Sequence, residues 1–332
     1  MTWAIRCRTT TATANRPGGV APGWKITLCA AGLGALAGCE SALRSSPPPP
    51  ARPPDLAAPA VAEPSPESRE LASYFTRVQA DLKAQGLMRV DGGGPDTPFS
   101  RRQLVENFIR IALFEEFTNI GGRLVAQQTE SRLHRWEQPV RMQVRFGDSV
   151  PVDQREADKA AITGYAARLA RLTGLPIALS DRNPNFHVFV VNEDERRDIG
   201  PELRAIIPDI SQGAIDTVQN MRRTTFCLVF ARDPRDEGRY SQAVAVIRGE
   251  HPDLLRLSCI HEELAQGLGL SNDSPMARPS IFNDDEEFGL LTTHDEMLLR
   301  MLYDPRMRPG MTAAEARPVA EVLALELLGG ES

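Results

Sequence analysis

The residues with the most chemical potential lie close together near residue 260, where His-Glu-Glu is followed by glutamine, glycine and asparagine. A His-Glu pair invites comparison with H-E-x-x-H, in which two histidines one helical turn apart bind zinc and the glutamate polarises water. Counted from His261, the second histidine position holds Ala265, so this signature is absent. Shifted by one residue, the longer pattern H-E-x-x-H-x-x-G-x-x-H keeps its glycine and has all three histidines replaced. The residues of this shifted frame are Glu262, Glu263, Gln266, Gly269 and Asn272.

Helical geometry favours the shifted frame. At 100° per residue, Glu262 and Gln266 lie together on one side of a predicted helix. His261 lies on the opposite, apolar side, so we expect a hydrogen-bonded core histidine, with a ligand as the alternative. Gly269 is expected to take a left-handed conformation that turns Asn272 back toward the polar side.

If this frame binds a metal, its ligands are Glu262, Gln266 and Asn272. Such a set offers only oxygen atoms, which suit calcium, magnesium or manganese better than zinc. Glu263 would then be the general base, taking a proton from metal-held water during peptide or amide hydrolysis. The alternative metal ligands are His261 and His294.

A family resemblance rests on three segments: 259–273, 278–284 (R-P-S-I-F-N-D) and 291–295 (L-T-T-H-D). Together they resemble an uncharacterised bacterial family named domain of unknown function 2927, over about residues 100–310. The resemblance implies a secreted or lipid-anchored envelope protein and brings no established activity. The kinship to zinc proteases rests on the shifted motif alone.

The apolar patterns predict an α+β fold, a single zincin-like domain with a helical C-terminus. A small mixed sheet backed by helices, with the motif helix after the last strand, is how zincin catalytic domains are built. This analogy of fold does not by itself carry an activity. The predicted strands are 140–146, 186–191, 224–230 and 242–247, with a turn signal at 236–238 between the last two. The predicted helices are 70–87, 101–117, 154–173, 193–207, the motif helix after Pro252, a helix capped by Thr292 or Thr293, and 313–328. Ser100 is predicted to cap the helix 101–117, and Thr312 the helix 313–328.

The amino terminus predicts a lipoprotein. The apolar run 26–37 has the length of a secretory signal and is too short to span a bilayer. It ends in Leu-Ala-Gly-Cys39, which resembles the bacterial lipobox. The resemblance implies that Cys39 is diacylated and becomes the first residue after cleavage. The alternative is an ordinary signal peptide with a chance cysteine. The predicted divisions are the signal peptide 1–38, a lipid-anchored Pro-rich tether 39–66, a helix with a Gly-rich linker 67–98, and the globular domain 99–329.

Charge and composition exclude some partners. The net charge is −6, and residues 1–38 carry four basic and no acidic side chains, so the rest of the chain is near −10. No basic cluster occurs, which argues against nucleic acid. The expected partners are the membrane, through the Cys39 lipid, and an envelope protein or peptidoglycan. The expected location is the bacterial cell envelope, with the globular domain in the periplasm.

Two cysteines, Cys227 and Cys259, follow the predicted lipidation site. An even number of cysteines in an oxidising compartment predicts a disulfide between them. The alternative makes Cys259 a soft metal ligand, because it lies three residues before Glu262 on nearly the same helix face.

Three functions are compatible with these observations. The first is a binding or scaffolding pseudoenzyme on a degenerate metallopeptidase-like scaffold, and this is the favoured interpretation. The second is a divergent metal-dependent peptidase or amidase acting on envelope protein or peptidoglycan peptide. The third is an unrelated fold in which the motif residues form a buried polar network. A buried acid pair needs compensation under any of the three.

Overall fold

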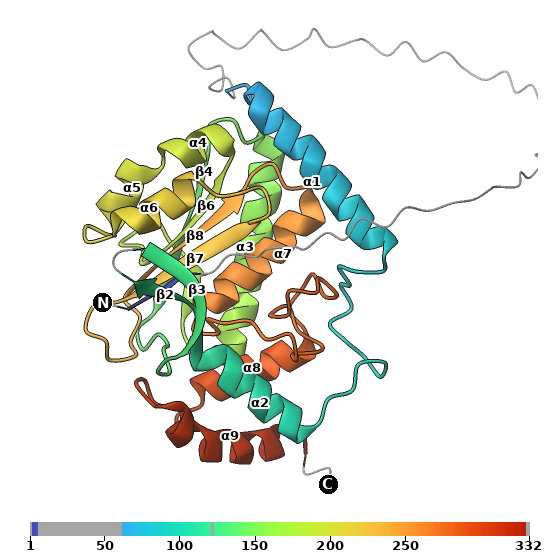
Figure 1. The fold of residues 1–332 in the computed structure, drawn as a ribbon, viewed down its shortest axis with the longest axis vertical. Coiled ribbons are helices and arrows are strands. Elements are labelled where there is room, and N and C mark those ends of the chain that lie inside the picture. The colour runs from blue at the N-terminus through green and yellow to red at the C-terminus, as the bar shows by residue number, and fades with distance from the viewer. Residues whose placement is uncertain (1, 6–61, 121–122, 330–332) are drawn as a thin grey trace, which may run out of the picture. The chain divides into compact units, whose positions relative to one another are not determined.

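A six-stranded mixed sheet forms the centre of the computed structural model, which describes residues 2–5, 62–120 and 123–329 (Figure 1). The strand order is β1-β7-β8-β6-β4-β5. The strands β5, β4, β6 and β8 run parallel, whereas β7 and β1 are antiparallel at one edge. The predicted α+β fold with a mixed sheet is therefore confirmed. The strands are β1 (Thr2–Ile5), β4 (Val140–Phe146), β5 (Ile177–Leu179), β6 (Phe186–Val191), β7 (Cys227–Asp233) and β8 (Gln242–Arg248).

The first strand, β1, falls inside the predicted signal peptide. It pairs only with β7, so cleavage before Cys39 would leave β7 as the edge strand of the sheet.

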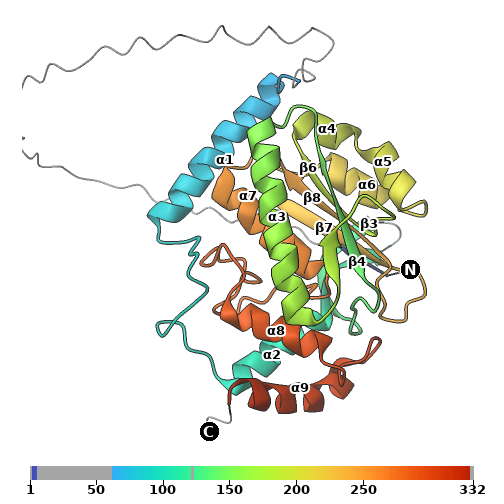
Figure 2. The ribbon, with the colours of Figure 1, turned by 180° about the vertical axis from the view of Figure 1, so that it is seen from behind.

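Side chains of the central strands alternate between two apolar layers, as the two-residue period of a strand requires. In β6, Phe186 and Val188 face one layer and Phe189 and Val191 face the other. Helices cover both faces, which explains why these strands are continuous apolar runs (Figure 2). One layer holds α1 (Pro66–Ala84), α3 (Val152–Thr173) and α7 (Asp253–Gln266), and the other holds α4 (Glu193–Asp198), α5 (Gly200–Ile206) and α6 (Gln212–Gln219).

Three capped helices pack together at one end of the domain: α2 (Arg101–Ala112), α8 (Thr293–Tyr303) and α9 (Ala313–Leu327) (Figure 1). Each begins with a capping box in which the cap hydroxyl and the third helical side chain satisfy two backbone N–H groups reciprocally. The predicted caps at Ser100, Thr292 and Thr312 are confirmed.

The predicted helix 101–117 is wrong over its last five residues. Helix α2 ends at Ala112, and a hairpin of β2 (Phe114–Ile120) and β3 (Arg123–Glu130) follows. The backbone carbonyls of Arg110 and Ile111 accept hydrogen bonds from Asn272 instead of from a further helical turn. A distant residue therefore ends this helix, and the local pattern does not contain that information.

The predicted helix 193–207 is also wrong as one element. It is divided into α4 and α5, because Pro201 has no N–H to donate to the carbonyl four residues earlier. The sequence prediction missed α6, β5 and the β2–β3 hairpin.

None of the helices within the described ranges is long and apolar enough to cross a membrane. Cys39 and nearly all of the predicted tether lie outside the described residues, so the signal peptide and lipidation stay predictions. Helix α1 begins at Pro66, the last residue of that predicted tether.

Candidate functional site

The motif helix α7 is buried along its second half, from Ser258 to Gln266. It follows β8 directly, begins after Pro252 and ends at Gln266. Apolar side chains such as Ile260 and Leu264 join the layer between the sheet and α3. The polar side of the helix is buried as well, so both sides have similarly low exposure to solvent.

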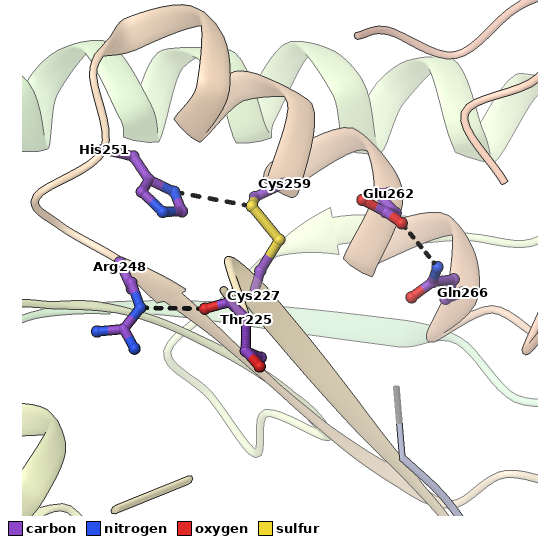
Figure 3. The surroundings of a disulfide bond; sticks show 7 residues. All are labelled: Thr225, Cys227, Arg248, His251, Cys259, Glu262 and Gln266. Atoms are coloured by element: carbon purple, nitrogen blue, oxygen red, sulfur yellow. Dashed lines mark hydrogen bonds between the residues drawn. A yellow bond between two sulfur atoms is a disulfide. The ribbon is translucent and has the colours of Figure 1, made fainter. Parts of the chain in front are cut away.

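The three polar side chains predicted on one side of α7 do lie together. Glu262 and Glu263 are each 1% exposed and Gln266 is 2% exposed. The Nε2 of Gln266 donates a hydrogen bond of 3.3 Å to Oε1 of Glu262, one helical turn away (Figure 3). One oxygen from each glutamate and the Sγ of Cys227 lie within 4.8 Å of one another.

A disulfide joins Cys227 to Cys259, which confirms the predicted pairing (Figure 3). Cys227 is the first residue of β7 and faces the layer that contains α7. The bond therefore ties the edge of the sheet to the motif helix, beside the glutamate pair. With its sulfur in a disulfide, Cys259 has no thiolate to offer a metal, which removes the alternative interpretation of this residue.

The turn after α7 is held by close backbone contacts. Gly269 has a φ of +123°, and a Cβ at this position would lie 2.2 Å from the carbonyl oxygen of His134. Glycine is therefore required, as predicted. The buried Asn272 follows, and its side-chain Nδ2 donates to the Arg110 carbonyl at 2.8 Å. The side-chain Nδ2 of Asn272 thus caps the end of α2. The assignment of Asn272 as a metal ligand stays a prediction.

His261 lies on the core side of α7, as predicted. Its ring stacks on the Tyr165 ring at a centroid distance of 4.0 Å, and its Nδ1 accepts a hydrogen bond from the Leu291 N–H at 3.1 Å. Burial, and to a smaller extent the charge of Arg168, lower the pKa of His261 to about 3. These contacts favour a structural role for His261 over the alternative role as a metal ligand.

His294 is fully buried between α2 and α8. Its Nε2 lies 3.1 Å from Nδ2 of Asn107, which can only donate, so Nε2 is the acceptor of this contact. The ring also meets the edge of Phe99 at a centroid distance of 4.8 Å. Because the lone pair of Nε2 is already used by Asn107 of α2, His294 is a weak candidate for the alternative metal ligand.

Comparison with known families gives one match. Residues 101–322 match the family described as "Protein of unknown function (DUF2927)". The chain belongs to the DUF2927 family. The predicted resemblance is therefore confirmed, and neither the curated proteins nor the solved structures contain a significant match. The DUF2927 match runs from α2 into α9 and includes α7 and both cysteines, whereas α1 precedes it.

The DUF2927 region contains a second group of potential ligands that the sequence did not predict. His134, Asp233 and Asp236 each offer one ligand atom, and these atoms lie within 4.8 Å of one another. Asp233 and Asp236 are three residues apart, but His134 lies about 100 residues earlier, so no ligand spacing in the sequence links the three. The only local signal was the Asp-Glu-Gly turn at 236–238, which predicted a hairpin but not a neighbouring histidine.

Proposed function

We propose that this DUF2927 protein is a lipid-anchored envelope protein whose zincin-like domain serves as a binding or scaffolding module without hydrolase activity. The observation that carries the proposal is the burial of the motif side chains. Glu262, Glu263 and Gln266 are each no more than 2% exposed, beside a disulfide.

Hydrolysis requires a substrate carbonyl and an activated water to reach the general base. A carboxylate that is 1% exposed, as Glu263 is, does not contact a peptide unless the domain rearranges. Metal activation is also weak in this frame, because its ligand positions supply oxygen and no nitrogen, whereas catalytic zinc sites use histidine. Both features favour a retained scaffold over an active enzyme.

The zincin-like interpretation draws support from the order of elements. The sheet is mixed and backed by helices, and α7 directly follows the last strand, β8. Gly269 occupies the glycine position of the shifted frame with a positive φ. These features are the ones on which the analogy with zinc proteases rests.

A scaffolding role also fits the predicted anchor. Residues 39–66 as an extended polyproline tether would reach about 85 Å, at about 3.1 Å per residue. This reach would let the domain contact an envelope protein or peptidoglycan well away from the membrane that holds Cys39.

One observation favours a second candidate, a divergent metal-dependent peptidase or amidase. One oxygen from Glu262 and one from Glu263 lie within 4.8 Å of each other, beside the Sγ of Cys227, which is already used in the disulfide. A cation held by the Glu262 carboxylate, with Gln266 one helical turn away, would place water next to Glu263, the predicted general base.

The two candidates are separated by paired assays on the full chain and on Glu262→Gln and Glu263→Gln, which preserve side-chain shape. We expect no hydrolysis of envelope proteins or peptidoglycan peptides by any of the three, and the same metal content in all. The scaffolding proposal also predicts that wild type and Glu263→Gln sediment equally with peptidoglycan or crosslink equally to the same envelope protein. Hydrolysis that disappears in Glu263→Gln, together with a metal lost from Glu262→Gln, would establish the second candidate instead.

A further inference from the structure

A group of three ligand-bearing residues lies beyond the end of α7, outside the motif. His134 is in the loop before β4, Asp233 is the last residue of β7, and Asp236 is in the turn between β7 and β8. His134 and Asp233 are buried, whereas Asp236 is exposed. The group therefore has two fixed, enclosed members and one member at the surface.

Backbone contacts hold His134 in place from both sides. The N–H of Arg135 donates to the Gly238 carbonyl, and the N–H of Gly310 donates to the Leu133 carbonyl. Gly269 presses against the carbonyl of His134 itself, at the close approach described above. The loop before β4 is thus bonded to the same turn that carries Asp236.

The hydrogen bonds of His134 determine which ring nitrogen carries a lone pair. Its Nδ1 lies 2.7 Å from the carbonyl oxygen of Arg132, which can only accept, so Nδ1 carries the hydrogen. In the neutral ring, Nε2 then has a free lone pair. A histidine that donates its other N–H to a backbone carbonyl is the usual arrangement in metal sites.

The Nε2 of His134 faces Oδ2 of Asp233 at 3.6 Å, and both side chains are at most 5% exposed. The Nε2 lone pair and the negative charge of the carboxylate repel each other in this buried site unless a proton or a metal cation lies between them. Two ligand atoms of a tetrahedral zinc, each about 2.0–2.2 Å from the metal, are about 3.3–3.6 Å apart. The observed distance of 3.6 Å between Nε2 of His134 and Oδ2 of Asp233 lies at the upper end of this range.

Asp233 is itself oriented by the turn. Its Oδ2 accepts hydrogen bonds from the backbone N–H groups of Gly238 at 2.6 Å and Arg239 at 3.1 Å. Its Oδ1 accepts from the Arg235 N–H at 3.2 Å. A ligand carboxylate held by donors in this way needs little further ordering to bind an ion.

We propose that His134, Asp233 and Asp236 bind a divalent transition-metal ion, with zinc as the best match. One imidazole nitrogen and two carboxylate oxygens form a mixed donor set that suits zinc better than calcium or magnesium. Three protein ligands leave a fourth position for water or for a carboxylate from a bound partner. Of the three residues, Asp233 also lines a cavity of about 310 Å³, together with Tyr240.

The test measures zinc binding to the purified full chain by isothermal titration calorimetry after removal of metal with a chelator. We expect one zinc per chain, with affinity at least about 10-fold weaker in Asp236→Asn and in His134→Gln. Asp236 is exposed, so its variant is expected to fold as wild type does, and circular dichroism checks this. The matched control is Glu237→Gln, a neighbouring carboxylate of the same turn outside the group, which should bind within about twofold of wild type.

Anomalous diffraction at the zinc edge then places the ion. A peak between His134 and Asp233 supports the proposal. The absence of stoichiometric binding, or equal affinity in wild type and Asp236→Asn, would overturn it and leave a proton shared by a His-Asp pair. A peak at Glu262 would also overturn it, in favour of the metal-dependent hydrolase. Hydrolysis lost in Glu263→Gln, with zinc still at His134, would instead overturn only the non-catalytic function.

Discussion

Replacing Gly269 with alanine is expected to destabilise the domain strongly, although only one methyl group is added. The backbone at this position has a φ of +123°, which side-chain-bearing residues rarely adopt. The added Cβ would lie 2.2 Å from the carbonyl oxygen of His134 and 3.1 Å from a methyl group of Leu302. Both the turn after α7 and the loop before β4 must then move.

The magnitude has two sources. A residue in a sparsely populated backbone region costs about 1–3 kcal/mol, and overpacking a close contact costs about 1–3 kcal/mol. We therefore expect Gly269→Ala to lower the free energy of unfolding by about 2–6 kcal/mol. Because the contact is to His134, the same variant should also weaken zinc binding if the proposed site exists.

The assay is urea unfolding followed by circular dichroism, with Gly164→Ala as the matched control. Gly164 is exposed in α3, and a Cβ there would have nothing within 4 Å. This control should stabilise the domain by about 0.5–1 kcal/mol, because alanine is the better helix former. A free energy of unfolding for Gly269→Ala within about 0.5 kcal/mol of wild type would refute the reasoning, since it lies far below either expected cost.

Two further predictions concern stability. Removing the disulfide with Cys227→Ala and Cys259→Ala opens a loop with a sequence separation of 32, so the free energy of unfolding should fall by about 4 kcal/mol in the chain-entropy model. Equal urea midpoints for wild type with and without reductant would contradict this. For acid stability, the folded pKa of His261 is about 3 and the usual value is near 6.5, so the unfolded state binds the proton and stability falls as pH drops below 6.5. Between pH 7 and pH 5, wild type should lose about 2 kcal/mol more than His261→Phe, which keeps the ring stack on Tyr165, and equal losses would argue against a buried neutral histidine.

The sequence predicted the elements whose signals are local. The apolar strand Phe186–Val191 and the capping box at Ser100 each depend on residues close together in the sequence, and both predictions are confirmed. The end of α2 was mispredicted because the last carbonyls of this helix accept hydrogen bonds from Asn272, about 160 residues later in the chain. Pro201 is a local signal for a break, but the residues around it favour a helix, so one continuous helix was predicted there.

The site was predictable only where a motif supplied spacing. Glu262 and Gln266 are brought together by the helical repeat, and the disulfide follows from cysteine parity. The group of His134, Asp233 and Asp236 depends instead on how the β7–β8 turn packs against the loop before β4. Such a contact between distant segments has no sequence period, so no pattern within the chain could indicate it.

The connections around α7 bear on the proposed zincin-like scaffold, because they join the segments that a metal at the motif would join. In a zinc site of this frame, the ion would join the helix to the segment that follows it. Here the Cys227–Cys259 disulfide joins the helix to the sheet, and Asn272 joins the following segment to α2. A disulfide and buried hydrogen bonds thus hold together the segments that a metal would hold. A zinc ion at His134 and Asp233 would add a further connection, from the β7–β8 turn to the loop that Gly269 contacts.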